Sequence, residues 1–231
     1  MLLYYITDRG QFPGDEAARR RRLVEKVGEA ARCGVDYIQL REKDLSSREL
    51  ELLAREAVKA VRTNAHLRTE NRDMRTALLI NSRTDVVLAS GADGVHLPAK
   101  DISPSEVREI WTRSLSSSSS PHRGLAGASC AVIGVSCHSI EEVRSAAGHS
   151  DFAVFGPVFE KRREPGSVPC GVAALQQACA EKIPVFALGG VTLENAEACR
   201  KAGAAGIAGV RLFQENDIRT VVEALAGAPR A

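Results

Sequence analysis

The 231-residue sequence predicts a single α/β barrel in which eight parallel strands alternate with helices. Short apolar, β-branched runs alternate eight times with longer stretches of helical period, which is the pattern of successive βαβ units. Barrels of this kind commonly form one domain of ~200 to 250 residues. A doubly wound open sheet is the alternative, but the count of eight and the Gly-Gly pair after the seventh strand favour closure. We therefore expect one (β/α)8 TIM-barrel domain over residues 1–231.

The strands are expected where apolar and β-branched residues run together. Strands buried on both faces read as continuous apolar runs, as Ala77-Leu78-Leu79-Ile80 does. The eight predicted strands are Leu2–Thr7, Tyr37–Arg41, Ala77–Asn81, Gly94–Leu97, Val132–Cys137, Phe152–Phe155, Val185–Leu188 and Gly206–Val210.

Helix boundaries are marked by two kinds of residue. Small polar side chains that accept hydrogen bonds from free N–H groups predict helix starts. Glycines that adopt a left-handed backbone conformation predict helix ends. The predicted starts are Ser46 or Ser47, Ser103, Ser139 and Thr192. Ser139 is also expected to form a capping box with Glu142. The predicted ends are Gly34, Gly91 and Gly203.

Two segments interrupt the alternation of strands and helices. The segment 114–127 contains five serines in a row. Polyserine cannot bury enough apolar area to offset its ordering entropy, so we expect a mobile surface loop there. The segment 63–75 is a polar, charged extension between the second helix and the third strand.

The composition is that of a soluble globular protein, with 44% hydrophobic residues, 26% charged residues and a net charge of +2. Such a charge does not suggest nucleic-acid binding, and the apolar run Leu2–Ile6 is too short to span a membrane. The six cysteines form no CxxC pair and have no metal-ligand spacing, which favours reduced thiols in the cytoplasm over structural zinc. The sequence leaves open whether the chain forms a homo-oligomer.

Three polar side chains, Gln39, Arg41 and Lys43, alternate at the end of the second strand. Alternation along a strand directs them to one side, toward the barrel axis. The functional residues of such barrels come from the C-terminal ends of the strands. Two cations and an amide donor that converge there suit a polyanion such as a diphosphate. A buried ion pair with Glu42 or Asp44 is the structural alternative.

Oxygen ligands follow the next two strands. Asn81 ends the third strand, and Asp101 lies beyond the fourth. Hard oxygen donors suit Mg2+ that bridges a phosphate.

The pair Gly189-Gly190 ends the seventh strand and lets backbone N–H groups approach a ligand closely. The next helix is expected to begin at Thr192, with the positive end of its dipole facing the same space. Together with Gly209 after the eighth strand, this pattern predicts a site for one phosphate monoester.

Two histidines end strands at the barrel mouth. His138 follows the fifth strand and could shuttle protons near neutral pH, although a lone histidine is more often structural. Strand alternation directs Cys137 away from the site, so we assign it to packing. We interpret His96 as a core histidine at a strand end.

Six spaced motifs occur in an order that resembles the thiamine-phosphate synthase/TenI superfamily, over about residues 2–225. The motifs are Tyr37-Ile38-Gln39-Leu40-Arg41-Glu42-Lys43-Asp44, Ile80-Asn81, Gly91-Ala92-Asp93-Gly94-Val95-His96-Leu97, Gly134-Val135-Ser136-Cys137-His138-Ser139, Phe155-Gly156-Pro157-Val158-Phe159 and Ala187-Leu188-Gly189-Gly190-Val191.

The resemblance implies an enzyme of thiamine biosynthesis that acts on small phosphorylated pyrimidine and thiazole substrates. In the synthase branch, hydroxymethylpyrimidine diphosphate loses its diphosphate, and the thiazole nitrogen captures the resulting pyrimidine methyl cation. The implied diphosphate ligands are Gln39, Arg41, Lys43, Asn81 and Lys161, with Ser136 nearby. The implied Mg2+ site lies at Asp101 and at the position of Ser82. The implied ligands of the thiazole phosphate are Gly189, Gly190, Gly209, Val210 and Arg211.

In the TenI branch, a histidine that matches His138 moves a proton on a carboxythiazole phosphate, with no cofactor. A non-catalytic paralogue that binds thiazole phosphate is a third alternative.

Three departures from the synthase pattern bear on this choice. Ser82 replaces one of the two aspartates that hold Mg2+, Pro98-Ala99 replaces Gly-Gln, and 160–163 replaces a Thr-x-Thr-Lys loop. Loss of a carboxylate should weaken Mg2+ binding. The synthase remains the expected function, because an isomerase of a monophosphate has no evident need for Gln39, Arg41 and Lys43 as a group.

Overall fold

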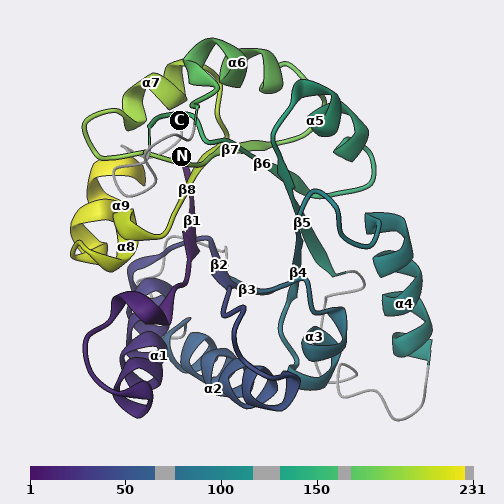
Figure 1. Cartoon of the computed structure of the whole chain (residues 1–231), viewed down its shortest axis with the longest axis vertical. Coiled ribbons are helices and arrows are strands. Elements are labelled where there is room, and N and C mark those ends of the chain that lie inside the picture. Colours follow the sequence, from purple (N-terminus) through teal and green to yellow (C-terminus); the bar gives the residue numbers. More distant parts are fainter. Residues whose placement is uncertain (66–75, 117–130, 161–167, 227–231) are drawn as a thin grey trace.

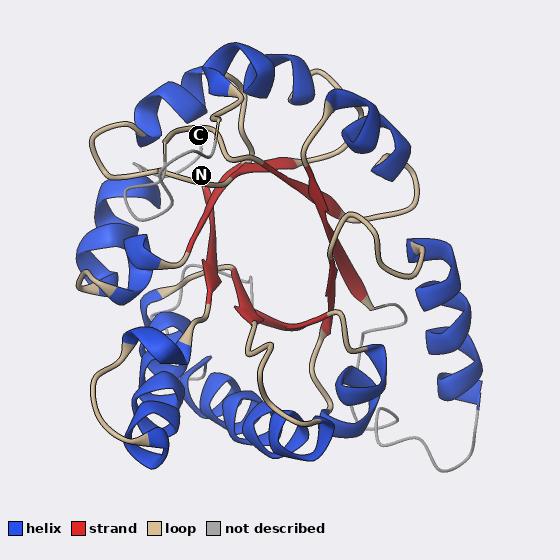
Figure 2. Cartoon of the chain, in the orientation of Figure 1, coloured by secondary structure: helices blue, strands red, loops and turns tan. Residues whose placement is uncertain are grey.

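Eight parallel strands pair in chain order and close on themselves, since β8 pairs with β1, and helices surround the barrel (Figure 1). This computed structural model describes residues 1–65, 76–116, 131–160 and 168–226. Figure 2 shows the strands as an inner ring and the helices as an outer one. The predicted (β/α)8 barrel is therefore confirmed, and the open doubly wound sheet is excluded.

The strands agree closely with those expected from the sequence. Four of them end one residue earlier, because the chain already turns into the loops above the barrel at Thr7, Arg41, Leu188 and Val210. The strands are β1 Leu2–Ile6, β2 Tyr37–Leu40, β3 Ala77–Asn81, β4 Gly94–Leu97, β5 Val132–Cys137, β6 Phe152–Phe155, β7 Val185–Ala187 and β8 Gly206–Gly209. The helices are η1 Arg9–Gln11, α1 Glu16–Cys33, α2 Ser47–Ala65, α3 Thr84–Ser90, α4 Pro104–Ser116, α5 Ile140–Ala146, α6 Gly171–Ala178, α7 Ala196–Lys201, α8 Arg211–Gln214 and α9 Ile218–Ala226.

Alternation along each strand divides the core into two parts. Outward residues such as Ile38 and Cys137 pack against the helices, as predicted for Cys137. Inward residues fill the barrel itself, and their lower layer is aromatic: the rings of Tyr4, Phe152 and Phe186 lie with centroids 5.0–5.9 Å apart. Large rings close the N-terminal end of the barrel, so inward side chains two positions further along each strand line its opposite end.

Helix starts follow the predicted caps in three cases. The hydroxyls of Ser46 and Ser103 each accept from the N–H of the glutamate three residues on, which returns its carboxylate to the serine N–H. Ser139 caps α5 in the same way, but the carboxylate of Glu142 accepts from the N–H of His138 and not from that of Ser139. Gly34, Gly91 and Gly203 all have positive φ, as expected.

The serine-rich segment begins later than predicted. Helix α4 continues to Ser116, so residues 114–116 are helical, and 117–127 lie outside the described residues. Helix α2 likewise extends to Ala65, so the first residues of the predicted extension 63–75 are helical. None of the helices in the described ranges is long and apolar enough to cross a bilayer.

Candidate active site

Above the aromatic layer, the inward side chains of β2 to β5 are polar, whereas Ile6 and Val154 on β1 and β6 are apolar. The polar side begins with an amide pair between β2 and β3. Gln39 is 1% exposed, and its Nε2 donates to Oδ1 of Asn81 over 2.9 Å. In the register of β3 and β4, Asn81 in turn lies beside His96. The structure thus brings together Gln39 and Asn81, two of the residues that the resemblance assigns to the diphosphate.

Arg9 binds both acidic residues of the second strand end. Its guanidinium donates to Glu42 over 3.0 Å and to both carboxylate oxygens of Asp44 over 2.7 and 2.6 Å. Hydrogen bonds from Arg9 lower the pKa of Asp44 to about 2, whereas burial raises the pKa of Glu42. The ion pair that we considered for Arg41 or Lys43 is therefore absent, because Arg9 already occupies both acidic partners.

Arg41 and Lys43 consequently keep uncompensated positive charge. Within the described ranges, neither side chain forms an ion pair. The backbone at this point is fixed: the Arg41 N–H donates to Oγ1 of Thr7 over 3.0 Å, and that hydroxyl donates to Glu42 over 2.6 Å. Arg41 is half-buried and Lys43 is exposed, so both cations are accessible to an anion at the barrel mouth.

The candidate Mg2+ ligands lie on the loops after β3 and β4, which are adjacent strands. Asp101 is exposed, and its Oδ1 accepts from the N–H of Ile102 over 2.8 Å, which leaves the other oxygen available. Ser82 has φ 62, and its N–H donates to the carbonyl of His96. The described residues contain no group of three or more His, Cys, Asp or Glu side chains that could hold a metal. Asp101, the Ser82 hydroxyl and the Asn81 amide would together supply one carboxylate and two neutral oxygens. Such a set suits Mg2+ that keeps water and phosphate oxygens as further ligands, and it is too small for a metal held by protein ligands alone.

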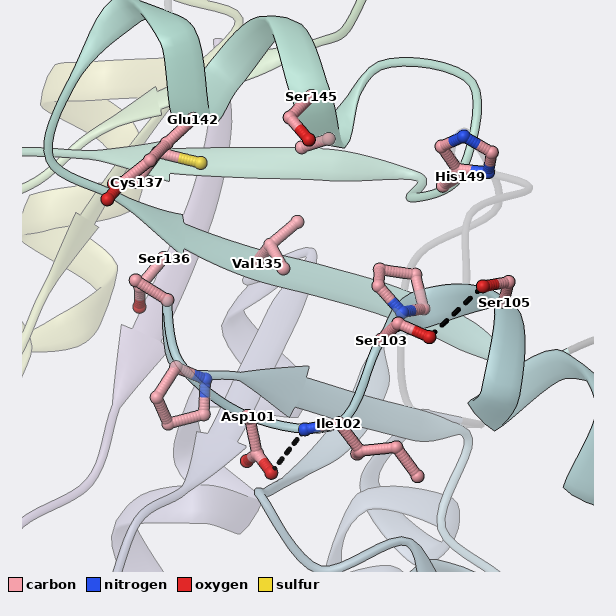
Figure 3. Close-up of a pocket in the computed structure, with 14 residues that line it drawn as sticks. Asp101, Ile102, Ser103, Ser105, Val135, Ser136, Cys137, Glu142, Ser145 and His149 are labelled. Atoms are coloured by element: carbon pink, nitrogen blue, oxygen red, sulfur yellow. Dashed lines mark hydrogen bonds between the residues drawn. The ribbon is translucent and has the colours of Figure 1, made fainter.

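Asp101 lines a cleft of about 330 Å³ between the β4–α4 loop and helix α5, on the outer side of β5, where Val135 and Cys137 also line it (Figure 3). Ser136 faces the barrel interior, where its Oγ lies 2.8 Å from Nε2 of His96. His96 is 3% exposed and also contacts the hydroxyl of Tyr4, so the interpretation of His96 as a core histidine is correct. Burial first, and the charge of Arg41 second, lower the pKa of His96 to about 3.

His138 is exposed at the end of β5 with a defined ring orientation. Its Nδ1 lies 2.8 Å from the carbonyl oxygen of Gly156, which can only accept, so Nδ1 carries the proton. The other ring nitrogen, Nε2, therefore presents a lone pair that could accept a proton.

The predicted phosphate site lies where β7 and β8 end together. Ala187 pairs with Ile207, so Gly190 and Val210 both follow the ends of neighbouring paired strands. No described residue accepts from the N–H of Gly190 or of Arg211, the first residue of α8. Gly190 has φ 65, and an added Cβ would lie 2.6 Å from the carbonyl oxygen of Glu160, so only glycine fits.

The predicted helix start at Thr192 is wrong. Helix α7 begins at Ala196, because Asn195 closes a turn: its Oδ1 accepts from the Thr192 N–H and its Nδ2 donates to the Gly190 carbonyl. Any phosphate bound at Gly190 would thus meet the free N–H groups of a turn and not the dipole of a long helix. Lys161, the remaining predicted diphosphate ligand, lies outside the described residues.

Substitution of Gly190 tests this site. A Gly190→Val variant should raise the Michaelis constant for the phosphate monoester expected at this site by about tenfold or more, because the moved backbone loses a charge-assisted hydrogen bond. Gly148→Val is the matched control, since Gly148 also has positive φ but an added Cβ meets no atom within 4 Å. Equal Michaelis constants in both variants would remove Gly190 from the phosphate site.

Comparisons with known proteins agree with this arrangement. Residues 3–213 match the family model described as thiamine monophosphate synthase. The chain is 36% identical to the thiamine-phosphate synthase of Halalkalibacterium halodurans, over 89% of this chain and 83% of that protein. It is 32% identical to that of Methanoculleus marisnigri, over 96% and 92% of the two chains. A solved structure, thiamine phosphate pyrophosphorylase from Pyrococcus furiosus, superposes with a TM-score of 0.72 at 28% identity, over 97% and 93% of the two chains. By this extent of similarity along almost its whole length, the chain belongs to the thiamine monophosphate synthase family.

Proposed function

We propose that this protein is a thiamine-phosphate synthase, which joins hydroxymethylpyrimidine diphosphate to thiazole phosphate and releases diphosphate. The observation that carries the proposal is the pairing of Arg9 with both Glu42 and Asp44, which leaves Arg41 and Lys43 uncompensated beside the amides of Gln39 and Asn81. Such a surplus of positive charge and amide donors suits a diphosphate and exceeds what a single monophosphate needs.

The two substrates are accommodated at opposite sides of the barrel mouth. The β2 and β3 ends hold the diphosphate, and the β7 and β8 ends hold the thiazole phosphate through the N–H groups of Gly190 and Arg211. The bond between the pyrimidine methylene carbon and the diphosphate oxygen breaks, and the thiazole nitrogen forms a bond to that carbon. Arg41 and Lys43 stabilise the negative charge that develops on the departing oxygen, which is where fixed cations lower a barrier most.

Mg2+ is the expected cofactor of this reaction. When bound, it neutralises part of the charge of the diphosphate. In this chain, Asp101, the Ser82 hydroxyl and the Asn81 amide oxygen are the residues that would hold it. A site with one carboxylate predicts weak Mg2+ binding.

A Mg2+ titration of thiamine phosphate formation tests the proposal. We expect activity that needs high Mg2+, and we expect Ser82→Asp to lower the Mg2+ concentration at half-maximal rate by restoring a second carboxylate. Aspartate tolerates the left-handed conformation of this position, so the variant should fold. Ser82→Ala is the control and should not lower the requirement. The proposal fails if neither the wild type nor Ser82→Asp forms thiamine phosphate at any Mg2+ concentration.

Thiazole tautomerase is the second candidate function, and the orientation of His138 favours it: Nε2 is free to accept a proton. A tautomerase of this kind would act without metal. For either reaction we propose a cytoplasmic location, in keeping with the free thiols of the described cysteines.

A further inference from the structure

A chain of three hydrogen-bonding side chains runs from the closed end of the barrel to its mouth. The Tyr4 hydroxyl lies 3.1 Å from Nδ1 of His96, and Nε2 of His96 lies 2.8 Å from Oγ of Ser136. The three residues stand on β1, β4 and β5, so the chain exists only because the barrel closes. Tyr4 is 0% exposed and His96 3%, whereas Ser136, near the end of β5, is partly exposed.

The direction of each hydrogen bond follows from what the buried groups can do. His96 is the partner of the Tyr4 hydroxyl among the described residues, so the phenol must donate to Nδ1 or leave its proton unsatisfied in the core. An imidazole nitrogen that accepts a hydrogen bond belongs to a neutral ring, because imidazolium has no acceptor. Nδ1 therefore accepts, and the single ring proton lies on Nε2, which donates to Ser136.

The packing around the chain fixes this arrangement. The Tyr4 ring contacts Phe152 and Phe186 edge-on, with centroids 5.4 and 5.9 Å away. Gly134 leaves room for the imidazole, because a Cβ there would lie 3.0 Å from Nδ1 of His96 and 2.5 Å from the Phe152 ring. Neither ring can turn away without disturbing the aromatic layer.

We propose that Tyr4 and His96 are positioning residues that make Ser136 a hydrogen-bond donor toward the diphosphate of the substrate. The Ser136 oxygen accepts from His96, so its own proton points away from the ring and is free to donate. An anionic phosphate oxygen accepts that proton but offers none in return, so a serine held in this state is matched to it. This inference rests on the proposed function, because it assigns Ser136 to the diphosphate.

The position of the His96 proton can be measured without any activity. In the full chain labelled with ¹⁵N-histidine, the His96 signal, identified by its loss in His96→Asn, should show a protonated Nε2 and an accepting Nδ1. A proton on Nδ1 would overturn the proposal, because Ser136 would then donate to His96 and not to the substrate.

Binding of inorganic diphosphate with Mg2+, followed by calorimetry, tests the effect on the ligand. Tyr4→Phe should weaken binding by about three- to tenfold, the usual range for one neutral hydrogen bond. Tyr5→Phe is the matched control: its hydroxyl is also buried but has no described partner, so binding should be unchanged. If Tyr4→Phe behaves like Tyr5→Phe, the positioning role is refuted.

Kinetics separate this role from a purely structural one. Tyr4→Phe should lower kcat without changing the Michaelis constant for thiazole phosphate, and Tyr4→Phe combined with Ser136→Ala should be no slower than Ser136→Ala alone. If the rate losses of Tyr4→Phe and Ser136→Ala multiplied in the double variant, the two residues would act independently, and the proposed hydrogen-bonded chain would be contradicted. A wild-type protein that shows the expected His96 proton and binds diphosphate, yet forms no thiamine phosphate, would refute the proposed function and leave the positioning chain intact.

Discussion

An Arg41→Ala variant is expected to form thiamine phosphate about 30- to 1,000-fold more slowly than the wild type. The range corresponds to the roughly 2 to 4 kcal/mol contributed by a preorganised group that stabilises charge in the transition state. Arg41 qualifies because its backbone is fixed by Thr7 and its potential acidic partners are held by Arg9. Initial rates at saturating substrates and Mg2+ measure the effect.

Arg113→Ala is the control for loss of one positive charge. Arg113 lies in the last turn of α4, which runs away from the barrel mouth, and its side chain is 80% exposed. Its rate should match that of the wild type. Equal rates for Arg41→Ala and Arg113→Ala would mean that Arg41 does not stabilise the departing diphosphate.

An Arg9→Met variant should lose about 3 to 5 kcal/mol of unfolding free energy, the scale for leaving one partner of a buried ion pair uncompensated. The side chains of Arg9 and Glu42 are 8% and 2% exposed, so water cannot replace the lost contact. Urea denaturation measures the change. Adding Glu42→Gln should recover part of the loss, because the buried charge is then removed. A loss of less than about 1 kcal/mol would place the pair among ordinary surface ion pairs.

The second ion pair of Arg9, with Asp44, affects stability in acid. The folded-state pKa of Asp44 lies near 2, below its ordinary value, because Arg9 donates to it. The folded protein therefore releases this proton more readily than the unfolded chain, so the contribution is present above about pH 4 and disappears as the pH falls toward 2. Arg9→Met should show a weaker decline of stability across this window.

The sequence predicted the features that depend on local pattern. Strand positions followed from apolar runs, and the inward direction of Gln39 and the outward direction of Cys137 followed from alternation. These predictions need only the order of the residues and the two-residue period of a strand. The caps at Ser46 and Ser103 were found for the same reason, since donor and acceptor lie three residues apart.

The features of the site that the sequence did not predict depend on contacts between segments that are distant along the chain. Arg9 pairs with Glu42 and Asp44 across more than 30 positions, and Tyr4 reaches His96 across 92. No local signal reveals either contact before the barrel closes. The Thr192 prediction failed for another reason: Asn195 satisfies the Thr192 N–H with its side chain and so favours a turn over a helical start.

Incubation of the protein with hydroxymethylpyrimidine diphosphate, thiazole phosphate and saturating Mg2+ tests the central claim most directly. We predict thiamine phosphate and diphosphate in equal amounts, with activity lost on adding EDTA and largely retained in His138→Gln. The contrary result is a reaction mixture without thiamine phosphate, together with a metal-independent tautomerisation of carboxythiazole phosphate that falls about 100-fold or more in His138→Gln, the usual scale of general acid–base catalysis.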